Sequence, residues 1–418
     1  MRPSIRRLEV QLLILCCLCQ ATLAQSPLTW QQVREKFEAA NPSLRAGELN
    51  VQESKAQEIS AFLRPNPGFT ATLDQLAPFT GNPYRPLAAA LPVIEFDYLR
   101  ERQHKRELRL ESAKTGTAIA ESQRLDLERA LLFSLRSAFV QTLQAKALLE
   151  NSKENLDYFD KELAIGRDRF KSGDIARVDL DRLALQRVQY EADYQTAVVS
   201  ARTAKIALLM LLNDRTPVDR FDISGAFELR DQIPPLEEFH TAALAARPDL
   251  KASLQAVSKA ETEHKLAIAN GSTDPVLGVN FGRLPPPYIG FNVTIPLRIF
   301  DRNQGEKART QIDVTLARRR KDVIEAQIFS DVDSAYFTLV SSTNLLRPYK
   351  TAGGYLETAT RIRDTMSFAY QRGQAALFDY LDGQRDYRAT QVAYINLVGS
   401  QLVAIAQLNM AVGREMIP

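Results

Sequence analysis

The sequence contains very little cysteine, histidine and tryptophan, and these absences exclude several kinds of site. All three cysteines lie within the first twenty residues, so the rest of the chain has neither disulfide bonds nor thiolate ligands. The three histidines, His104, His240 and His264, stand far apart, and none has a metal-ligating residue four positions after it. We therefore expect no resident metal ion and no cofactor.

Motifs of enzymes and of nucleic-acid-binding proteins are also missing. The sequence has no glycine-rich phosphate loop and no nucleophile–base motif. Its formal net charge is only +3 over 418 residues, which gives no reason to expect a nucleic-acid partner. We therefore predict a protein that is not an enzyme and does not bind nucleic acid.

Long hydrophobic runs are scarce. At the start of the chain, three arginines precede an apolar core at residues 12–18, and Thr22 and Ala24 are small residues suited to cleavage. This pattern predicts a secretory signal at residues 1–24, with an N-terminal anchor as the alternative. Beyond it no uninterrupted apolar run approaches 20 residues, so we expect no transmembrane helix there. Such a chain can enter a membrane only as β-strands in a closed barrel.

Proline and glycine are almost absent from one long stretch. Residues 98–170 contain no proline and only two glycines, Gly116 and Gly166, which predicts about 70 residues of helix, roughly 100 Å long. A helix of this length needs partner helices along it, as in a coiled coil. The next helix has a seam whose steps alternate between three and four residues, interrupted only at Arg187. The seam consists of Leu180, Leu183, Tyr190, Tyr194, Ala197, Ala201, Ala204, Leu208 and Leu211.

A short strand that leads directly into a long charged helix occurs twice. In FNVTIPLRIFD, residues 291–301, an alternating strand is followed by a helix that we expect to begin at Asp301. LPVIEFDYLRER, residues 91–102, is a shorter version of the same pattern. The alternation predicts four strands, each with one apolar face, at residues 69–76, 87–96, 276–282 and 288–297.

The two halves of the chain repeat one plan. Arg247-Pro248-Asp249-Leu250 matches Asn41-Pro42-Ser43-Leu44, and Gly373 matches Gly173 about two hundred residues earlier. We predict two structural repeats, residues 25–213 and 236–418, joined by a linker at residues 214–235. The fold class is mainly α with a small β part: duplicated long α-helical hairpins plus two strand pairs.

Two strand pairs are too few to form a stable membrane structure in one chain. A two-stranded hairpin is marginal alone, and four strands cannot close a barrel. Three chains would supply 12 strands, which lies within the range of outer-membrane barrels. We therefore expect a trimer with one shared barrel, continued by a coiled-coil tube of helices.

At this point the chain resembles the outer membrane efflux protein family, of which TolC is the best-known member. The resemblance rests on NPSL and RPDL, on PLRIFDRNQGE at residues 296–306, and on RFKSGDIARVDL and YQRGQAALFDYLD. The PLRIFDRNQGE form is similar to the metal-exporting CzcC subgroup. The resemblance implies a homotrimer in outer-membrane lipid, with a trimeric 12-stranded β-barrel and an α-helical tunnel in the periplasm. It also implies a periplasmic adaptor protein and an inner-membrane pump as partners.

The resemblance also implies roles for residues at the two helix–helix turns. A carboxylate pair one helical turn apart narrows the periplasmic end of the tunnel in the family, and Asp379 and Asp382 match it. An i, i+3 pair shares one helix face, so a trimer would present rings of carboxylates that favour cations. The alternative is a pair of solvated charges that complement the helix dipole.

A latch between neighbouring hairpins is implied at the same end. Asp179 matches the acidic member and Tyr370 matches its tyrosine partner. The arginine of the family pattern falls on Ala375, so either closure is weaker here or Arg372 or Arg385 substitutes.

The turn residues themselves are the implied adaptor-docking sites, because small residues allow close backbone approach. The alternative is that they only reverse the chain. They are Gly173, Asp174, Ile175, Ala176, Gly373, Gln374, Ala375 and Ala376.

A different function class remains open from the residues alone. A periplasmic coiled-coil adaptor or scaffold protein also carries long helical hairpins. Adaptors usually have one hairpin flanked by compact β-domains, whereas this chain duplicates its hairpins and has little β structure elsewhere. The duplication favours the passive outer-membrane exit duct.

Overall fold

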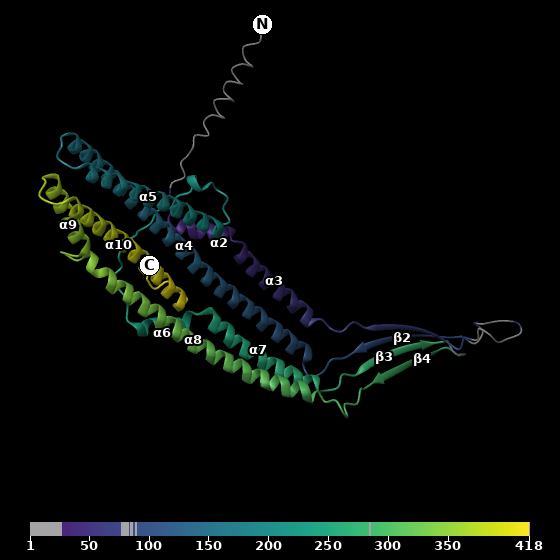
Figure 1. The fold of residues 1–418 in the computed structure, drawn as a ribbon. Helices are drawn as coiled ribbons and strands as arrows, with labels where there is room; N and C mark the ends of the chain where they lie inside the picture. Colours follow the sequence, from purple (N-terminus) through teal and green to yellow (C-terminus); the bar gives the residue numbers. More distant parts are fainter. Residues whose placement is uncertain (1–26, 77–82, 84–86, 88–89, 284–285, 418) are drawn as a thin grey trace, which may run out of the picture. The chain divides into compact units, whose positions relative to one another are not determined.

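The computed structural model describes residues 27–76, 83, 87, 90–283 and 286–417. The predicted signal segment, its three cysteines and most of the turn at residues 77–85 lie outside these described residues. The described chain is mainly helical with one small antiparallel sheet, which confirms the predicted fold class (Figure 1).

The helices and strands follow the predicted order. The helices are α2 (Trp30–Ala40), α3 (Pro42–Phe62), α4 (Lys105–Lys171), α5 (Arg177–Leu211), α6 (Leu236–Ala246), α7 (Pro248–Asn270), α8 (Gln304–Lys350), α9 (Tyr355–Gln371) and α10 (Leu377–Val412), with a short 3₁₀ helix, η1 (Val218–Arg220). The strands are β1 (Gly68–Asp74), β2 (Leu91–Leu99), β3 (Val276–Gly282) and β4 (Tyr288–Thr294).

Several predicted boundaries are wrong at the strand-to-helix junctions. The first long helix does not begin at Tyr98, because β2 continues to Leu99 and α4 starts at Lys105. Gln103 and His104 separate the two elements and both have positive φ, which turns the chain before the helix can start. β2 starts at Leu91 rather than at residue 87, and α8 starts at Gln304 rather than at Asp301.

The chain forms two compact units, and each combines segments from both predicted repeats. The sheet unit comprises residues 44–128 and 241–330, and the hairpin unit comprises residues 1–43, 129–240 and 331–418. The repeat boundaries therefore remain a prediction from the sequence. Each unit is described by itself below.

In the sheet unit, the four strands pair in the order β1-β2-β3-β4, antiparallel throughout (Figure 1). β2 pairs with β3, so the two predicted strand pairs form one sheet rather than two separate hairpins. The register places Phe69 opposite Phe96, Phe96 opposite Val279, and Val279 opposite Phe291. Because side chains alternate along a strand, one face of the sheet is apolar across all four strands.

The apolar face of the sheet is exposed. Phe291 is 82% exposed, and Phe69 and Ile289 are each 63% exposed. The opposite face is mostly small or polar, with Thr70, Thr72, Glu95, Asp97, Gly278, Asn280, Gly290 and Asn292. An exposed apolar surface of this extent indicates a face that contacts something other than water.

Two glycines allow the polar face to carry large amide side chains. A Cβ at Gly278 would clash with the side chain of Asn292, and one at Gly290 would clash with that of Asn280. The amide of Asn292 then donates to the carboxylate of Glu95 at 3.0 Å. The glycines are therefore needed for cross-strand packing on this face.

Helices in the sheet unit are joined by side-chain hydrogen bonds. Ser122 of α4 donates to Gln255 of α7 at 2.8 Å. His264 of α7 and Thr310 of α8 are hydrogen-bonded at 2.9 Å. Small residues such as Ala260 and Ala267 are buried beside these contacts, so the helix backbones approach closely.

In the hairpin unit, α4 pairs with α5 and α9 pairs with α10, each through a tight turn (Figure 1). The predicted seam on α5 is confirmed, because Leu183, Tyr190, Ala201 and Leu208 are all buried. A core joins the two helix pairs near their turns and contains Leu156, Phe159, Leu163, Leu183, Tyr190, Tyr370, Leu377 and Tyr380.

Among the described residues, α10 is long and apolar enough to cross a membrane by length and composition alone. However, 61% of its apolar window is buried inside the protein. Val398, Ile405 and Leu408 are among its buried residues. We therefore assign α10 as a core helix of the hairpin unit.

The predicted linker is part of the hairpin unit's core. Phe221 and Ile223 are almost fully buried, and Ile223 forms a β-bridge with Leu28. The amine of Lys146 donates to Asp222 at 2.7 Å. Residues 214–235 are thus anchored to α4 and to the start of the chain rather than being a free tether.

Burial on the α5 seam gives a stability prediction. Leu208 is fully buried, so Leu208→Asp would place an unpaired carboxylate in an apolar core and should cost several kcal/mol. Lys153→Asp on the exposed surface of α4 is the control and should change stability by less than about 0.5 kcal/mol. Thermal unfolding and trimer yield in detergent measure both. Equal melting temperatures and yields would contradict the seam assignment.

Candidate functional site

The two helix–helix turns of the hairpin unit have the same backbone structure. Gly173 and Gly373 both adopt positive φ, 84° and 72°. The amide of Asp174 donates to the carbonyl of Arg169 at 2.8 Å, and that of Gln374 donates to Ala369 at 2.8 Å. This pattern is the Schellman type of helix end. The left-handed glycine places the amide of the following residue so that it donates to a carbonyl of the last helical turn.

The predicted adaptor-docking residues all lie in these two turns. Ile175 and Ala375 are half-buried at equivalent positions, whereas the other six are exposed. A Cβ at either glycine would meet no atom within 4 Å, so only the backbone conformation demands glycine there. Their docking role stays a prediction.

The predicted gate residues lie on the first two turns of α10. Asp379 is exposed, whereas Asp382 is half-buried and forms an ion pair with Arg385 at 2.5 Å. Asp386 lies 3.6 Å from the same guanidinium. The two carboxylates are therefore not equivalent, because Arg385 already neutralises one of them.

The predicted latch residues lie near each other, but the expected arginines are engaged elsewhere. Burial raises the pKa of the Tyr370 hydroxyl, and the nearby charge of Asp179 raises it further. Arg372 lies over the ring of Phe368, 4.3 Å from its centroid, and Arg385 is paired with Asp382. The latch stays a prediction for contacts between chains.

A different arginine contacts Tyr370. Arg169 at the end of α4 donates to the Tyr370 carbonyl at 2.9 Å, and its guanidinium lies 5.0 Å from the centre of the Tyr370 ring. The ring of Tyr370 stacks on Tyr380 with centroids 4.9 Å apart. Arg169 thus joins the two helix hairpins directly. Sequence reasoning missed it, because nothing in its spacing distinguishes it from a surface arginine.

A buried carboxylate lies next to this aromatic stack. Glu162 of α4 is 7% exposed and accepts a hydrogen bond from Gln371 at 3.2 Å. Tyr158 and Ser367, which are hydrogen-bonded to each other at 3.2 Å, extend the network. Burial raises the pKa of Glu162, and the surrounding polar side chains, Tyr158 first, oppose the shift. This network links α4 to α9, and the described residues that contact the Glu162 carboxyl are hydrogen-bonding groups rather than cations.

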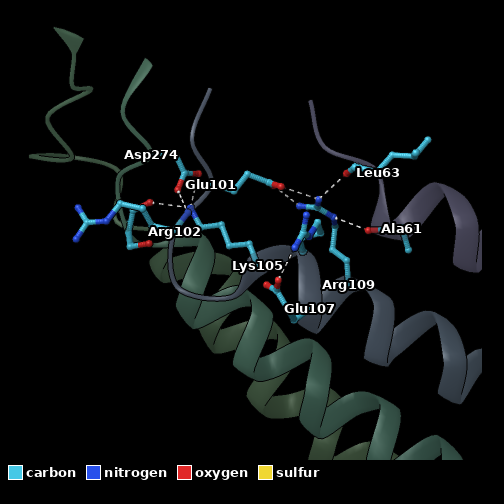
Figure 2. Close-up of polar contacts among 10 residues, drawn as sticks. Ala61, Leu63, Glu101, Arg102, Lys105, Glu107, Arg109 and Asp274 are labelled. Atoms are coloured by element: carbon cyan, nitrogen blue, oxygen red, sulfur yellow. Dashed lines mark hydrogen bonds and ion pairs between the residues drawn. The ribbon is translucent and has the colours of Figure 1, made fainter. Parts of the chain in front are cut away.

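The strand-to-helix junction of the sheet unit is a second polar cluster (Figure 2). Lys105 at the start of α4 is almost fully buried and donates to Asp274 at 2.5 Å and to the carbonyl of Ser272 at 3.0 Å. Asp274 also accepts the backbone amide of Arg102 at 2.9 Å. The loop before β3 is thereby tied to the turn before α4.

Arg109 ties the same junction to α3. Its guanidinium pairs with Glu101 and donates to the carbonyls of Ala61 at 3.3 Å and Leu63 at 3.4 Å (Figure 2). Removal of Arg109 would leave the carboxylate of Glu101, whose side chain is 15% exposed, without its cationic partner. The junction is thus a rigid connection between strands and helices.

The described residues hold no group of three or more metal-ligating side chains placed to bind an ion. His240 is hydrogen-bonded to Asp333 at 2.7 Å, and His264 is hydrogen-bonded to Thr310 at 2.9 Å.

Comparison with known proteins supports one family. The profile of the family described as "Outer membrane efflux protein" matches residues 286–414, from the loop before β4 to the end of α10. Over 407 residues, the chain is 22% identical to the cobalt-zinc-cadmium resistance protein CzcC of Cupriavidus metallidurans, and the alignment covers 94% of this chain and 91% of CzcC.

The chain is therefore similar to the outer membrane efflux protein family, through the matched residues 286–414 and through CzcC. Two solved structures share the fold of this chain. A membrane protein from Pseudomonas aeruginosa and CusC, whose structures concern folding and transmembrane channel formation, each superpose with a TM-score of 0.77 at 17% identity. Both alignments cover 92% of this chain and 92% of the other.

The buried Glu162 gives a pH prediction. Because its pKa is raised in the folded state, the folded protein keeps a proton that the unfolded chain has already lost. The stability of the wild type should therefore fall as pH rises from the ordinary value of 4.5 to the raised pKa, and then level off. Glu162→Gln removes this dependence.

Thermal melting of wild type and Glu162→Gln in detergent between pH 4 and pH 8 measures the effect. The melting temperature of the wild type should drop relative to the variant by a few degrees as pH rises. Glu154→Gln on the exposed surface of α4 is the matched control and should follow the wild type. Parallel curves for wild type and Glu162→Gln would show that the carboxyl titrates normally.

Proposed function

We propose that three copies of this chain form the outer-membrane channel of a tripartite efflux system. The channel is a passive exit duct: an inner-membrane pump supplies the energy and a periplasmic adaptor connects the two. The observation that carries the proposal is the exposed apolar face of a sheet with two open edges, in a chain whose fold matches solved family members over nearly its whole length.

The sheet explains why several copies are needed. β1 and β4 are the outer strands, so each has one row of backbone groups that the described strands do not pair. In lipid such edges are too costly, and pairing β1 of one copy with β4 of the next removes them. Three copies close a 12-stranded barrel. The apolar face then contacts lipid, and the face with Glu95, Asp97 and Asn292 lines a hydrated interior.

The helices carry a second surface that supports assembly. α5 exposes an apolar residue at every seventh position, on the side away from its buried seam. These residues are Val178, Leu185, Ala192, Val199 and Ile206. A heptad stripe on a helix that is already packed on its other face is typical of a second coiled-coil contact. We assign this stripe to a neighbouring copy in the tube of helices.

The cargo is proposed from the relative with the widest coverage. CzcC is a cobalt-zinc-cadmium resistance protein, so divalent metal ions are the cargo class we assign to this channel. The ions pass through as substrate, and the chain needs no resident metal site for this. The turns at Gly173 and Gly373 are the proposed adaptor-docking points, and no catalytic step is assigned to any residue.

Assembly and conduction test the function together. Protein extracted from membranes with detergent should run as a trimer and should open stable conductance steps in planar bilayers. Protein dissociated to monomers should be silent, because one chain cannot close a barrel. A monomer that conducts ions would rule out the shared barrel, and a protein that leaves membranes on carbonate washing would favour the adaptor alternative.

The gate assignment gives a sharper conductance prediction. If Asp379 and Asp382 ring the periplasmic entrance, divalent cations added from that side should block current, since hard cations prefer several carboxylate oxygens. Asp379→Ala with Asp382→Ala should raise the blocking constant on the order of tenfold and leave folding intact. Raised salt should weaken the block.

Arg385 makes the gate test asymmetric. Because Asp382 is paired with Arg385, Asp379→Ala alone should weaken the block more than Asp382→Ala alone. Arg385→Gln should strengthen the block by freeing Asp382. Asp174→Ala in the other turn is the control. An unchanged blocking constant in the double variant would identify the two aspartates as solvated helix-start charges.

A further inference from the structure

A basic hollow lies at the helix end of the sheet. Its volume is about 380 Å³, and it is formed where the end of α3, the end of β2 and the start of α4 meet. Four basic and two acidic side chains line it, namely Arg64, Arg100, Lys105 and Arg106 with Glu101 and Glu107. All of these residues belong to the sheet unit, so the hollow is a feature of one compact unit.

The acidic side chains of the hollow are already neutralised. Glu101 pairs with Arg109, which does not line the hollow, and Glu107 pairs with Arg106 at 2.9 Å. Lys105 is satisfied by Asp274. The carboxylates therefore do not cancel the charge of Arg64 and Arg100.

Unused hydrogen-bond donors remain in the hollow. Arg64 and Arg100 are exposed, and their guanidinium groups make no hydrogen bond or ion pair with another described residue. The Nε atom of Arg106 is buried without a hydrogen-bond partner among the described residues. A buried donor of this kind is stabilised when an acceptor enters. The hollow thus presents positive charge and free N–H groups to an anionic ligand with several oxygens.

The other wall of the hollow is apolar. Tyr98 and Leu277 are a cross-strand pair on the exposed apolar face, and both line the hollow. Phe62 and Leu63 at the end of α3 are exposed beside it, 45% and 61%. Beyond β4, at the same end of the sheet, Phe300 is 90% exposed. The arginines lie on the helix side of the hollow, and the tyrosine and aliphatic side chains lie on its sheet side. This change from basic to apolar side chains is typical of a membrane–water interface.

We propose that this hollow binds the headgroup phosphate of an anionic phospholipid whose acyl chains lie on the apolar face of the sheet. The proposal rests on the outer-membrane location proposed above. A guanidinium group binds phosphate oxygens through two parallel N–H groups, so Arg64 and Arg100 hold the phosphate and Arg106 supplies a further donor. β2 and β3 are the inner strands of the sheet, so edge pairing with a neighbouring copy leaves the wall formed by Tyr98 and Leu277 open to lipid.

Lipid retention by the intact protein tests this site. Wild type, Arg64→Gln/Arg100→Gln and the control Arg319→Gln/Arg320→Gln are purified in detergent and mixed with phosphatidylglycerol or phosphatidylcholine. The control pair lies on the exposed surface of α8 in the same unit. Native mass spectrometry should show about one phosphatidylglycerol retained per wild-type or control chain. The Arg64/Arg100 variant should bind it on the order of tenfold more weakly.

Three further outcomes decide the interpretation. Phosphatidylcholine should be retained less than phosphatidylglycerol, since its headgroup carries no net charge. Inorganic phosphate at millimolar concentration should not displace the lipid, and full displacement would overturn the lipid assignment in favour of a free-anion site. Equal retention by all three proteins would overturn the site itself.

Conductance separates this inference from the proposed function. Bilayer conductance and trimer content should be the same in the Arg64/Arg100 variant and the wild type, because neither arginine lies on the polar face of the sheet. A protein that conducts as a trimer but binds phosphatidylglycerol equally well without the two arginines contradicts the lipid site alone. A wild type that neither forms trimers nor conducts contradicts the channel, and with it the premise of the lipid site.

Discussion

The structure depends on one unsatisfied requirement: a four-stranded sheet with an apolar face and two unpaired edges. In water the exposed face would cost free energy in proportion to its area, and in lipid the open edges would cost even more. Closure with other copies in a membrane, as proposed above, would satisfy both conditions. The helices that follow β2 and β4 would then start from the rim of the closed barrel.

The junction between β2 and α4 must therefore join two different backbone conformations within a few residues. Side chains must change from a two-residue to a 3.6-residue period within a few residues, and the backbone does so through positive φ at Gln103 and His104. Two contacts stabilise this turn. Lys105 forms a buried ion pair with Asp274, and the guanidinium of Arg109 donates to a carbonyl at the end of α3. The arginines left over at its surface are those assigned to lipid.

The hairpin turns show the opposite design. They are exposed, and they need glycine only for its backbone conformation. The contacts that stabilise this end of the hairpins lie a few residues away, in the stacked tyrosines and the Glu162 network. Exposed turns of small residues beside a well-packed core are consistent with the adaptor-docking role proposed above. The polar network inside the core stabilises one relative placement of the two hairpins, since a buried carboxyl must keep its partners.

Local patterns in the sequence determined the long helices, the four strands and the two glycine turns, because each depends on residues close along the chain. They also carried the family resemblance through the order of several weak motifs. The pairing of β2 with β3, the anchoring of residues 214–235 and the contact of Arg169 with Tyr370 required the tertiary structure. Each joins residues far apart in sequence whose types are common on any surface, so only their meeting in space distinguishes them. The same holds for Glu162 and for the arginines of the hollow. The sequence shows their charge, but tertiary packing decides that Glu162 is buried and that Arg64 and Arg100 have no acidic partner among the described residues.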